Sequence, residues 1–247
     1  MLIKRISRAL IDMDLKEFFV ELLVVVVGVF LAIQVENWNS ARKELNQEKL
    51  LLASLHAEFV ENMAIGKRSI ERFEEVEAAA LQLLEISQKA QDPTMSDFYS
   101  SLNHALAIRP PQLNSNTWDV LVASGQLTIL RNAKIKEEVA DFYKSLATYS
   151  DVFMKRAESE SGEAEATLMK HLDLVDFVYT LHPEDLPFLK YDSEELLALD
   201  PHVRAEIRSL SIQAWHNARD FRGNLESSLD QSQDIQDQIA IELKRFE

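Results

Sequence analysis

The longest apolar stretch of the chain, from Leu22 to Ile33, limits the possible folds more than any other feature. Together with its flanks, the segment from Phe18 to Trp38 has the ~17–25 residues that a helix needs to cross a bilayer. Aromatic residues stand at both borders of this segment, as they do at membrane interfaces. We therefore expect residues 18–38 to form a transmembrane helix. A buried core helix and a cleaved signal peptide are the alternatives, although no small-x-small cleavage site follows the run.

The cationic residues on the two sides of this segment favour one orientation. Four precede it and three follow it before residue 51: Lys4, Arg5, Arg8 and Lys16, then Arg42, Lys43 and Lys49. Because cytoplasmic flanks are richer in Lys and Arg, we expect residues 1–17 to be a cytoplasmic amphipathic segment and residues 39–247 to be extracytoplasmic. Glu21 lies about one turn inside the span, where it either reaches the headgroups or contacts a partner helix.

The scarcity of turn-forming residues predicts an all-α fold. The chain has five glycines and six prolines in 247 residues, whereas β-sandwiches and barrels need a turn every ~8–12 residues. The prolines separate three long stretches in which apolar residues recur every three or four positions: Leu45 to Leu84, Ile135 to Val178 and Val203 to Leu243. This spacing marks one face of a helix. We expect the first of these helices to continue from the membrane helix into an elongated antiparallel bundle of three long helices.

The block from residue 92 to 132 differs from these long stretches and predicts a distal cap of short helices. Ser96 is a candidate N-cap of the first short helix, and Asn116 or Thr117 of the second. Gly125 is a candidate left-handed C-cap, and Asn132 a candidate N-cap of the second long helix. In this arrangement the second long helix returns towards the membrane, residues 182–192 form a loop near it, and the third helix runs outward.

The residues that carry catalytic or metal chemistry form no recognisable constellation. There is no cysteine, no His-x-x-x-His pair, no Glu-x-x-His motif and no glycine-rich phosphate loop. His182 and His202 flank the expected loop, and four glutamates crowd one stretch: Glu158, Glu160, Glu163 and Glu165. A solvated surface explains both sets of residues. A metal site at the histidines and a cation patch at the glutamates are the alternatives. A net charge of −15 disfavours a broad nucleic-acid surface. We expect no enzyme activity, cofactor or bound metal.

Two stretches resemble a family of uncharacterised bacterial single-pass membrane proteins. In the first, the family has an acidic residue, an apolar span and an Asn-x-Trp-Asn exit. Glu21, Asn37, Trp38 and Asn39 carry the resemblance, and in this chain Asn37 directly precedes Trp38. In the second, a short helix ends in Ser-Gly and a Tyr-bearing helix follows. The matching residues are Trp118, Ser124, Gly125, Leu127, Leu130 and Tyr143. The resemblance covers about a fifth of the chain. It implies a domain of unknown function in a bacterial inner membrane, with the C-terminal domain in the periplasm, and implies no activity.

These observations favour a non-catalytic, membrane-anchored helical scaffold or protein-interaction protein. Its expected partners are the lipid bilayer and another protein or a second copy of itself, with no nucleic acid and no identified small-molecule substrate. The candidate partner contacts are Glu21, Asn37, Trp38, Trp118 and Gly125. The alternative is an extracytoplasmic ligand-sensing bundle that signals through a partner at the membrane, because ligands can bind between helices.

Overall fold

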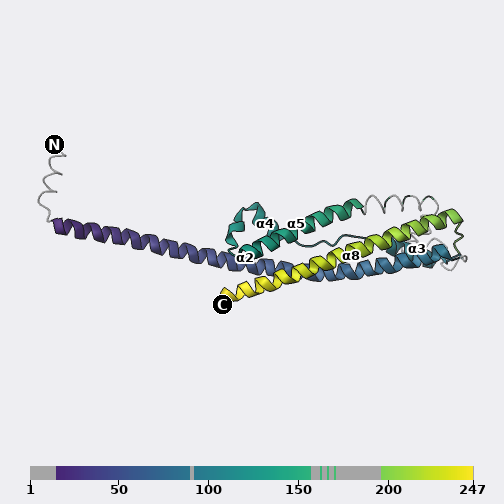
Figure 1. Cartoon of the computed structure of the whole chain (residues 1–247), viewed down its shortest axis with the longest axis horizontal. Helices are drawn as coiled ribbons and strands as arrows, with labels where there is room; N and C mark the ends of the chain where they lie inside the picture. The colour runs from purple at the N-terminus through teal and green to yellow at the C-terminus, as the bar shows by residue number, and fades with distance from the viewer. Residues whose placement is uncertain are drawn as a thin grey trace, which may run out of the picture. The chain divides into compact units, whose positions relative to one another are not determined.

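The computed structural model describes residues 15–89, 92–156, 162, 166, 170 and 196–246. Within these ranges the chain is helical and forms no sheet, so the expected all-α class is confirmed (Figure 1). The α-helices are α2 (Leu15–Gln88), α3 (Met95–Leu106), α4 (Asn116–Ala123), α5 (Ala133–Arg156) and α8 (Pro201–Leu243). Two 3-10 helices accompany them, η1 (Gln126–Ile129) and η3 (Lys244–Phe246).

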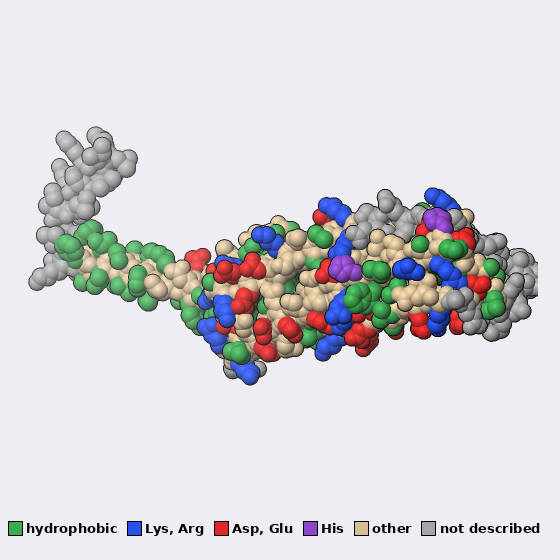
Figure 2. Space-filling view, turned by 45° about the vertical axis from the view of Figure 1, so that its right-hand side comes forward, with side chains coloured by type: hydrophobic (Ala, Val, Ile, Leu, Met, Phe, Trp, Pro, Cys, Tyr) green, Lys and Arg blue, Asp and Glu red, His purple; other side chains and the backbone are tan. Residues whose placement is uncertain are grey.

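The chain divides into two compact units, residues 1–51 and 52–247, and helix α2 contributes to both. In the first unit α2 is long and apolar enough to cross a membrane, and none of its apolar window is buried. Figure 2 shows hydrophobic side chains over this N-terminal part of α2. A core helix would bury such a surface, so the exposure favours a membrane span over a core helix.

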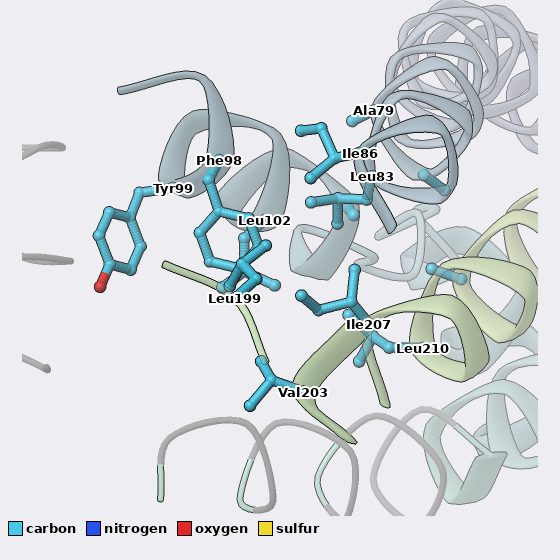
Figure 3. Close-up of a cluster of buried hydrophobic side chains, with 13 residues drawn as sticks. Ala79, Leu83, Ile86, Phe98, Tyr99, Leu102, Leu199, Val203, Ile207 and Leu210 are labelled. Atoms are coloured by element: carbon cyan, nitrogen blue, oxygen red, sulfur yellow. The ribbon is translucent and has the colours of Figure 1, made fainter. Parts of the chain in front are cut away.

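The core of the second unit lies where α2, α3, α5 and α8 meet. One cluster joins α2, α3 and α8 and is drawn in Figure 3; it includes Leu83, Phe98 and Ile207, each fully buried. A second cluster joins α2, α5 and α8 through three phenylalanines, Phe73, Phe153 and Phe221. Both clusters use the three- and four-residue spacing of apolar positions, which places those side chains on one face of each helix.

Helix α5 runs parallel to α2, which corrects the expected direction of the second long helix. Phe59 of α2 packs on Phe142 with ring centroids 5.0 Å apart, and Phe73 packs on Phe153 at 6.2 Å. The residue numbers of the two helices therefore rise together. Helix α8 runs antiparallel to α5, since Tyr149 donates to the Phe221 carbonyl and Gln238 to Glu138. The physical reason is that the segment after α3 returns alongside α2 before α5 begins.

The short helices do not form one cap, which corrects a second expectation. Helix α3 packs beside Ile86 of α2, whereas the backbone N–H of Thr117 in α4 donates to Glu58 of the same helix. Positions 58 and 86 lie on the order of 40 Å apart along an α-helix. Pro110 and Pro111 lie within the segment that connects α3 to α4, and neither residue has a backbone N–H to continue a helix.

The ends of the helices confirm some predicted caps and replace others. The Asn132 side chain accepts from the backbone N–H of Lys134 and Ile135, and Gly125 has the expected left-handed φ of 69°. Thr94, not Ser96, caps α3, because its hydroxyl accepts from the backbone N–H of Asp97 at 3.1 Å. Neither Asn116 nor Thr117 caps α4, since both lie inside the helix.

An arginine from α8 closes the C-terminal end of α2. The Arg204 guanidinium donates to the carbonyls of Ile86 and Lys89, at 3.0 and 2.9 Å, and to the Asp92 carboxylate. These bonds supply partners for helix-end carbonyls that have none within the helix. The predicted loop at 182–192, the four clustered glutamates, His182 and residues 1–14 lie outside the described residues.

Candidate functional site

The second unit contains a groove of about 740 Å³ between the 110–115 segment, helix α4 and helix α5. Nine of its lining residues are apolar or aromatic, among them Pro110, Pro111, Trp118, Val122, Tyr143 and Ala147. Polar side chains, including Asp119 and Lys144, complete the lining. The groove therefore combines a broad apolar surface with a few charged groups, the usual composition of a recognition site.

The spacing of residues along α5 creates the wall of the groove. Ala140, Tyr143 and Ala147 follow one another at steps of three and four, so they share one helical face. The two alanines leave space on either side of the tyrosine ring. Val139 and Phe142 point to a different face and are buried, with Phe142 packed on Phe59 of α2.

A stacked aromatic pair forms the floor. The rings of Trp118 and Tyr143 lie nearly parallel, with an interplanar angle of 11° and centroids 5.5 Å apart. The Tyr143 hydroxyl donates to Glu58 Oε1 at 2.5 Å, which holds the phenol ring in place from below. Burial, together with the hydrogen bond and the negative charge of Glu58, raises the pKa of Tyr143, so its hydroxyl stays protonated as a donor.

Glu58 serves both as the acceptor for Tyr143 and as the cap of helix α4. It is 4% exposed, and its Oε2 accepts from the backbone N–H of Thr117 at 2.6 Å. A carboxylate at this position also interacts favourably with the positive end of the α4 dipole. The N-terminus of helix α4 is therefore capped by a side chain from another helix, α2. Sequence reasoning missed Glu58, and the available signal was an acidic residue beside the apolar positions Leu55 and Phe59.

A reciprocal asparagine pair attaches the proline segment to α2. Asn62 is fully buried, and its side chain donates to the Asn114 carbonyl at 2.8 Å while accepting from the Asn114 backbone N–H at 2.6 Å. The pair satisfies both polar atoms of a buried amide, which would otherwise be costly to bury. It fixes the second wall of the groove. Sequence reasoning missed Asn62 as well, although it is a polar residue next to Met63, which packs against the core.

The charged and polar groups of the groove are available to a partner. Lys144 is exposed, and no carboxylate of the described part of the chain forms an ion pair with it. Asp119 accepts from the Ser115 hydroxyl at 2.7 Å and otherwise faces solvent. The groove thus offers a positive and a negative group beside its aromatic floor. It can hold an extended chain through apolar contacts and orient it through these charges.

The sequence-predicted contact residues fall in different places. Trp118 lines the groove, whereas Gly125 lies at the turn after α4 and is exposed. Glu21, Asn37 and Trp38 belong to the first unit and are exposed there. Trp38 contacts a cation, since the Arg42 guanidinium lies 5.9 Å from the indole centroid.

The described residues contain no group of three or more His, Cys, Asp or Glu side chains that could hold a metal ion. His202 pairs with Glu206 at 3.3 Å on the surface of α8. Comparison with protein families, with curated proteins and with solved structures finds no match to the chain. The resemblance to uncharacterised bacterial membrane proteins therefore stays an expectation, and the function has to be read from the groove and the apolar helix.

Proposed function

We propose that the protein is a non-catalytic interaction protein, anchored in a membrane by α2, whose second unit binds an extended segment of a partner protein. The observation that carries this proposal is the groove with the stacked Trp118–Tyr143 floor. From α2, Glu58 holds the Tyr143 ring of the floor and Asn62 holds the wall formed by the proline segment, so the surface is organised before any partner arrives. Such preorganisation lowers the entropic cost of binding.

The dimensions of the groove suit an extended peptide. Its lining residues on α5 run from Ala140 to Ser150, a length of about 15 Å at ~1.5 Å per residue. An extended chain at ~3.3 Å per residue places four or five residues in that length. Aromatic-lined grooves recognise proline-containing extended segments in this way. Lys144 adds a preference for an acidic side chain in the bound segment.

The membrane anchor is the second element of the proposal. Residues 18–38 would cross the inner membrane of a bacterium with the N-terminus in the cytoplasm, so that the interaction unit lies on the other side. The exposed apolar surface of α2 and the cationic residues before it support this arrangement. Nucleic acid is not among the proposed partners, because the net charge of −15 opposes phosphate binding.

Ligand sensing is the second candidate function, and the volume of the groove favours it. Small-molecule sites typically enclose ~300–1,000 Å³, and the groove has about 740 Å³. A sensor would also need a signalling partner that contacts residues 1–21 at the membrane. Loss of signalling on replacing Glu21, with normal expression and an intact groove, would support this function over the first.

Site-specific photo-crosslinking in cells tests the proposal. Val122 lines the groove and is 49% exposed, whereas Val152 is on α5, outside the groove, and is 54% exposed. A photoreactive residue at position 122 should label a partner, and mass spectrometry should map the label to an extended, proline-containing segment. The same probe at position 152 is the matched control.

A variant that fills the groove completes the test. Ala147 is exposed and lines the groove, so Ala147→Trp should fill the space without disturbing the core. This change should abolish labelling from position 122. Equal labelling from both positions, or labelling that persists in Ala147→Trp, would refute the proposed binding site.

A further inference from the structure

We infer that Trp38 and Arg42 form a collar that binds a lipid phosphate and sets the depth of α2 in the bilayer. This inference rests on the proposed membrane anchoring and adds a specific headgroup contact to it. The two residues are one helical turn apart, and the Arg42 guanidinium lies 5.9 Å from the centroid of the Trp38 ring. A cation in that position is attracted by the face of the indole.

The position of Trp38 along α2 matches the edge of a bilayer. Phe18 and Phe19 mark one end of the exposed apolar segment and Trp38 the other. Trp38 follows Phe18 by twenty helical positions, which at ~1.5 Å per residue is about 30 Å. That length equals the hydrocarbon thickness of a typical bilayer. Arg42 then lies about 6 Å further along the axis, at the level of the phosphates.

The guanidinium of Arg42 retains its hydrogen-bonding capacity. In the second unit, the guanidinium groups of Arg204 and Arg222 are each engaged by a carboxylate. No carboxylate among the described residues pairs with Arg42, and its guanidinium lies over the indole of Trp38. The indole fixes the direction of the planar donor group, and such a group binds a phosphate through two parallel N–H bonds.

The proposed ligand is the phosphate of a lipid and not a free anion. Trp38 is 65% exposed, and the apolar side chains of the preceding turns are exposed as well. In a bilayer these side chains contact lipid, so the nearest phosphates belong to the lipid headgroups. The indole ring then occupies the interface, where aromatic rings are enriched.

Depth-dependent fluorescence quenching of the full-length protein tests this inference. The protein is reconstituted into phosphatidylcholine vesicles that contain lipids brominated either high or low on the acyl chain. The emission of Trp38 is obtained by subtracting the fluorescence spectrum of Trp38→Phe from that of the wild-type protein. In the wild-type protein the shallow bromines should quench the emission of Trp38 more strongly than the deep bromines do. The quenching ratio is the quenching by shallow bromines divided by the quenching by deep bromines. This ratio should fall in Arg42→Gln, because the contact that holds the indole at the interface is lost.

Lys43→Gln is the matched control, since it removes one positive charge from the adjacent position. It should leave the quenching ratio unchanged, and Arg42→Lys should restore it only in part. An equal shift in Arg42→Gln and Lys43→Gln, or no shift in either, would overturn the collar. A wild-type ratio that changes when inorganic phosphate is added would show a free-anion site instead and would overturn it too.

Flotation of the same vesicles separates the two hypotheses. If the wild-type protein does not float with the vesicles, the proposed membrane anchoring is wrong. If every variant floats and the quenching ratio ignores Arg42, the anchoring stands and the collar is wrong.

Discussion

Replacing Tyr143 with phenylalanine removes one hydroxyl group and keeps the ring that stacks on Trp118. The lost hydrogen bond has a buried carboxylate as its acceptor, Glu58, at 2.5 Å. Hydrogen bonds to charged groups contribute about 1.5–3 kcal/mol. Because Glu58 Oε1 is left buried without that donor, we expect Tyr143→Phe to lower the free energy of unfolding by about 2–3 kcal/mol.

A second tyrosine provides the matched control. Tyr149 also lies on α5, and its hydroxyl donates to the neutral backbone carbonyl of Phe221 at 3.0 Å. A neutral hydrogen bond contributes about 1 kcal/mol. Tyr149→Phe should therefore destabilise the protein less than Tyr143→Phe, although each change removes the same atom.

A double-mutant cycle isolates the interaction between Glu58 and Tyr143. Glu58→Ala should cost more than either tyrosine change, because it also removes the cap of α4, a loss of about 1 kcal/mol. The coupling between Glu58→Ala and Tyr143→Phe should be about 1.5–3 kcal/mol. Urea unfolding of the full chain in detergent micelles, followed by far-UV circular dichroism, measures each value. Coupling near zero, or equal costs for the two tyrosines, would refute the assignment of Glu58 as a charged acceptor.

Three further predictions concern stability and use the same unfolding measurement. A Cβ at Gly66 would lie 2.9 Å from Leu229 Cδ1, so Gly66→Ala should destabilise the protein by about 1 kcal/mol, since overpacking outweighs the gain in helix propensity. A Cβ at Gly223 would have no atom within 4 Å, so Gly223→Ala should stabilise the protein by about 0.5–1 kcal/mol. Stabilisation by Gly66→Ala together with destabilisation by Gly223→Ala would contradict the close approach of α2 and α8. Arg204→Gln should cost about 2–4 kcal/mol because it leaves helix-end carbonyls without donors, while Arg156→Gln, at a more exposed ion pair, should cost less than about 1 kcal/mol. Finally, the pKa of Tyr143 is raised in the folded state. Its contribution to the free energy of unfolding is therefore complete below pH ~10, the pKa of an unfolded tyrosine, and is lost as the pH rises above that value. The free energy of unfolding should fall less steeply with alkaline pH in Tyr143→Phe than in the wild type.

The caps show how far local sequence carries a prediction. Asn132 and Gly125 could be assigned from sequence because each acts on backbone groups within a few residues of itself. The cap of α4 could not, because its acceptor, Glu58, lies 59 residues away. A local rule applied to Asn116 and Thr117 therefore named the wrong residues. Of the candidate site, Trp118 was identified from a resemblance, whereas Glu58 and Asn62, which bind Tyr143 and Asn114, were not identified.

The sequence by itself determined the class of the fold and the apolar helix. Glycine and proline are scarce, apolar residues recur at helical spacing, and one stretch is long and apolar enough to span a membrane. These properties act within a few turns of one helix, so no tertiary contact is needed to recognise them. Only the tertiary structure decided the direction of α5 and the position of α4. Those depend on which buried polar groups find partners far along the chain, as Asn62 does with Asn114 and Glu58 with Tyr143. The groove exists because these pairings, and not the helix periodicity, place the proline segment beside α5.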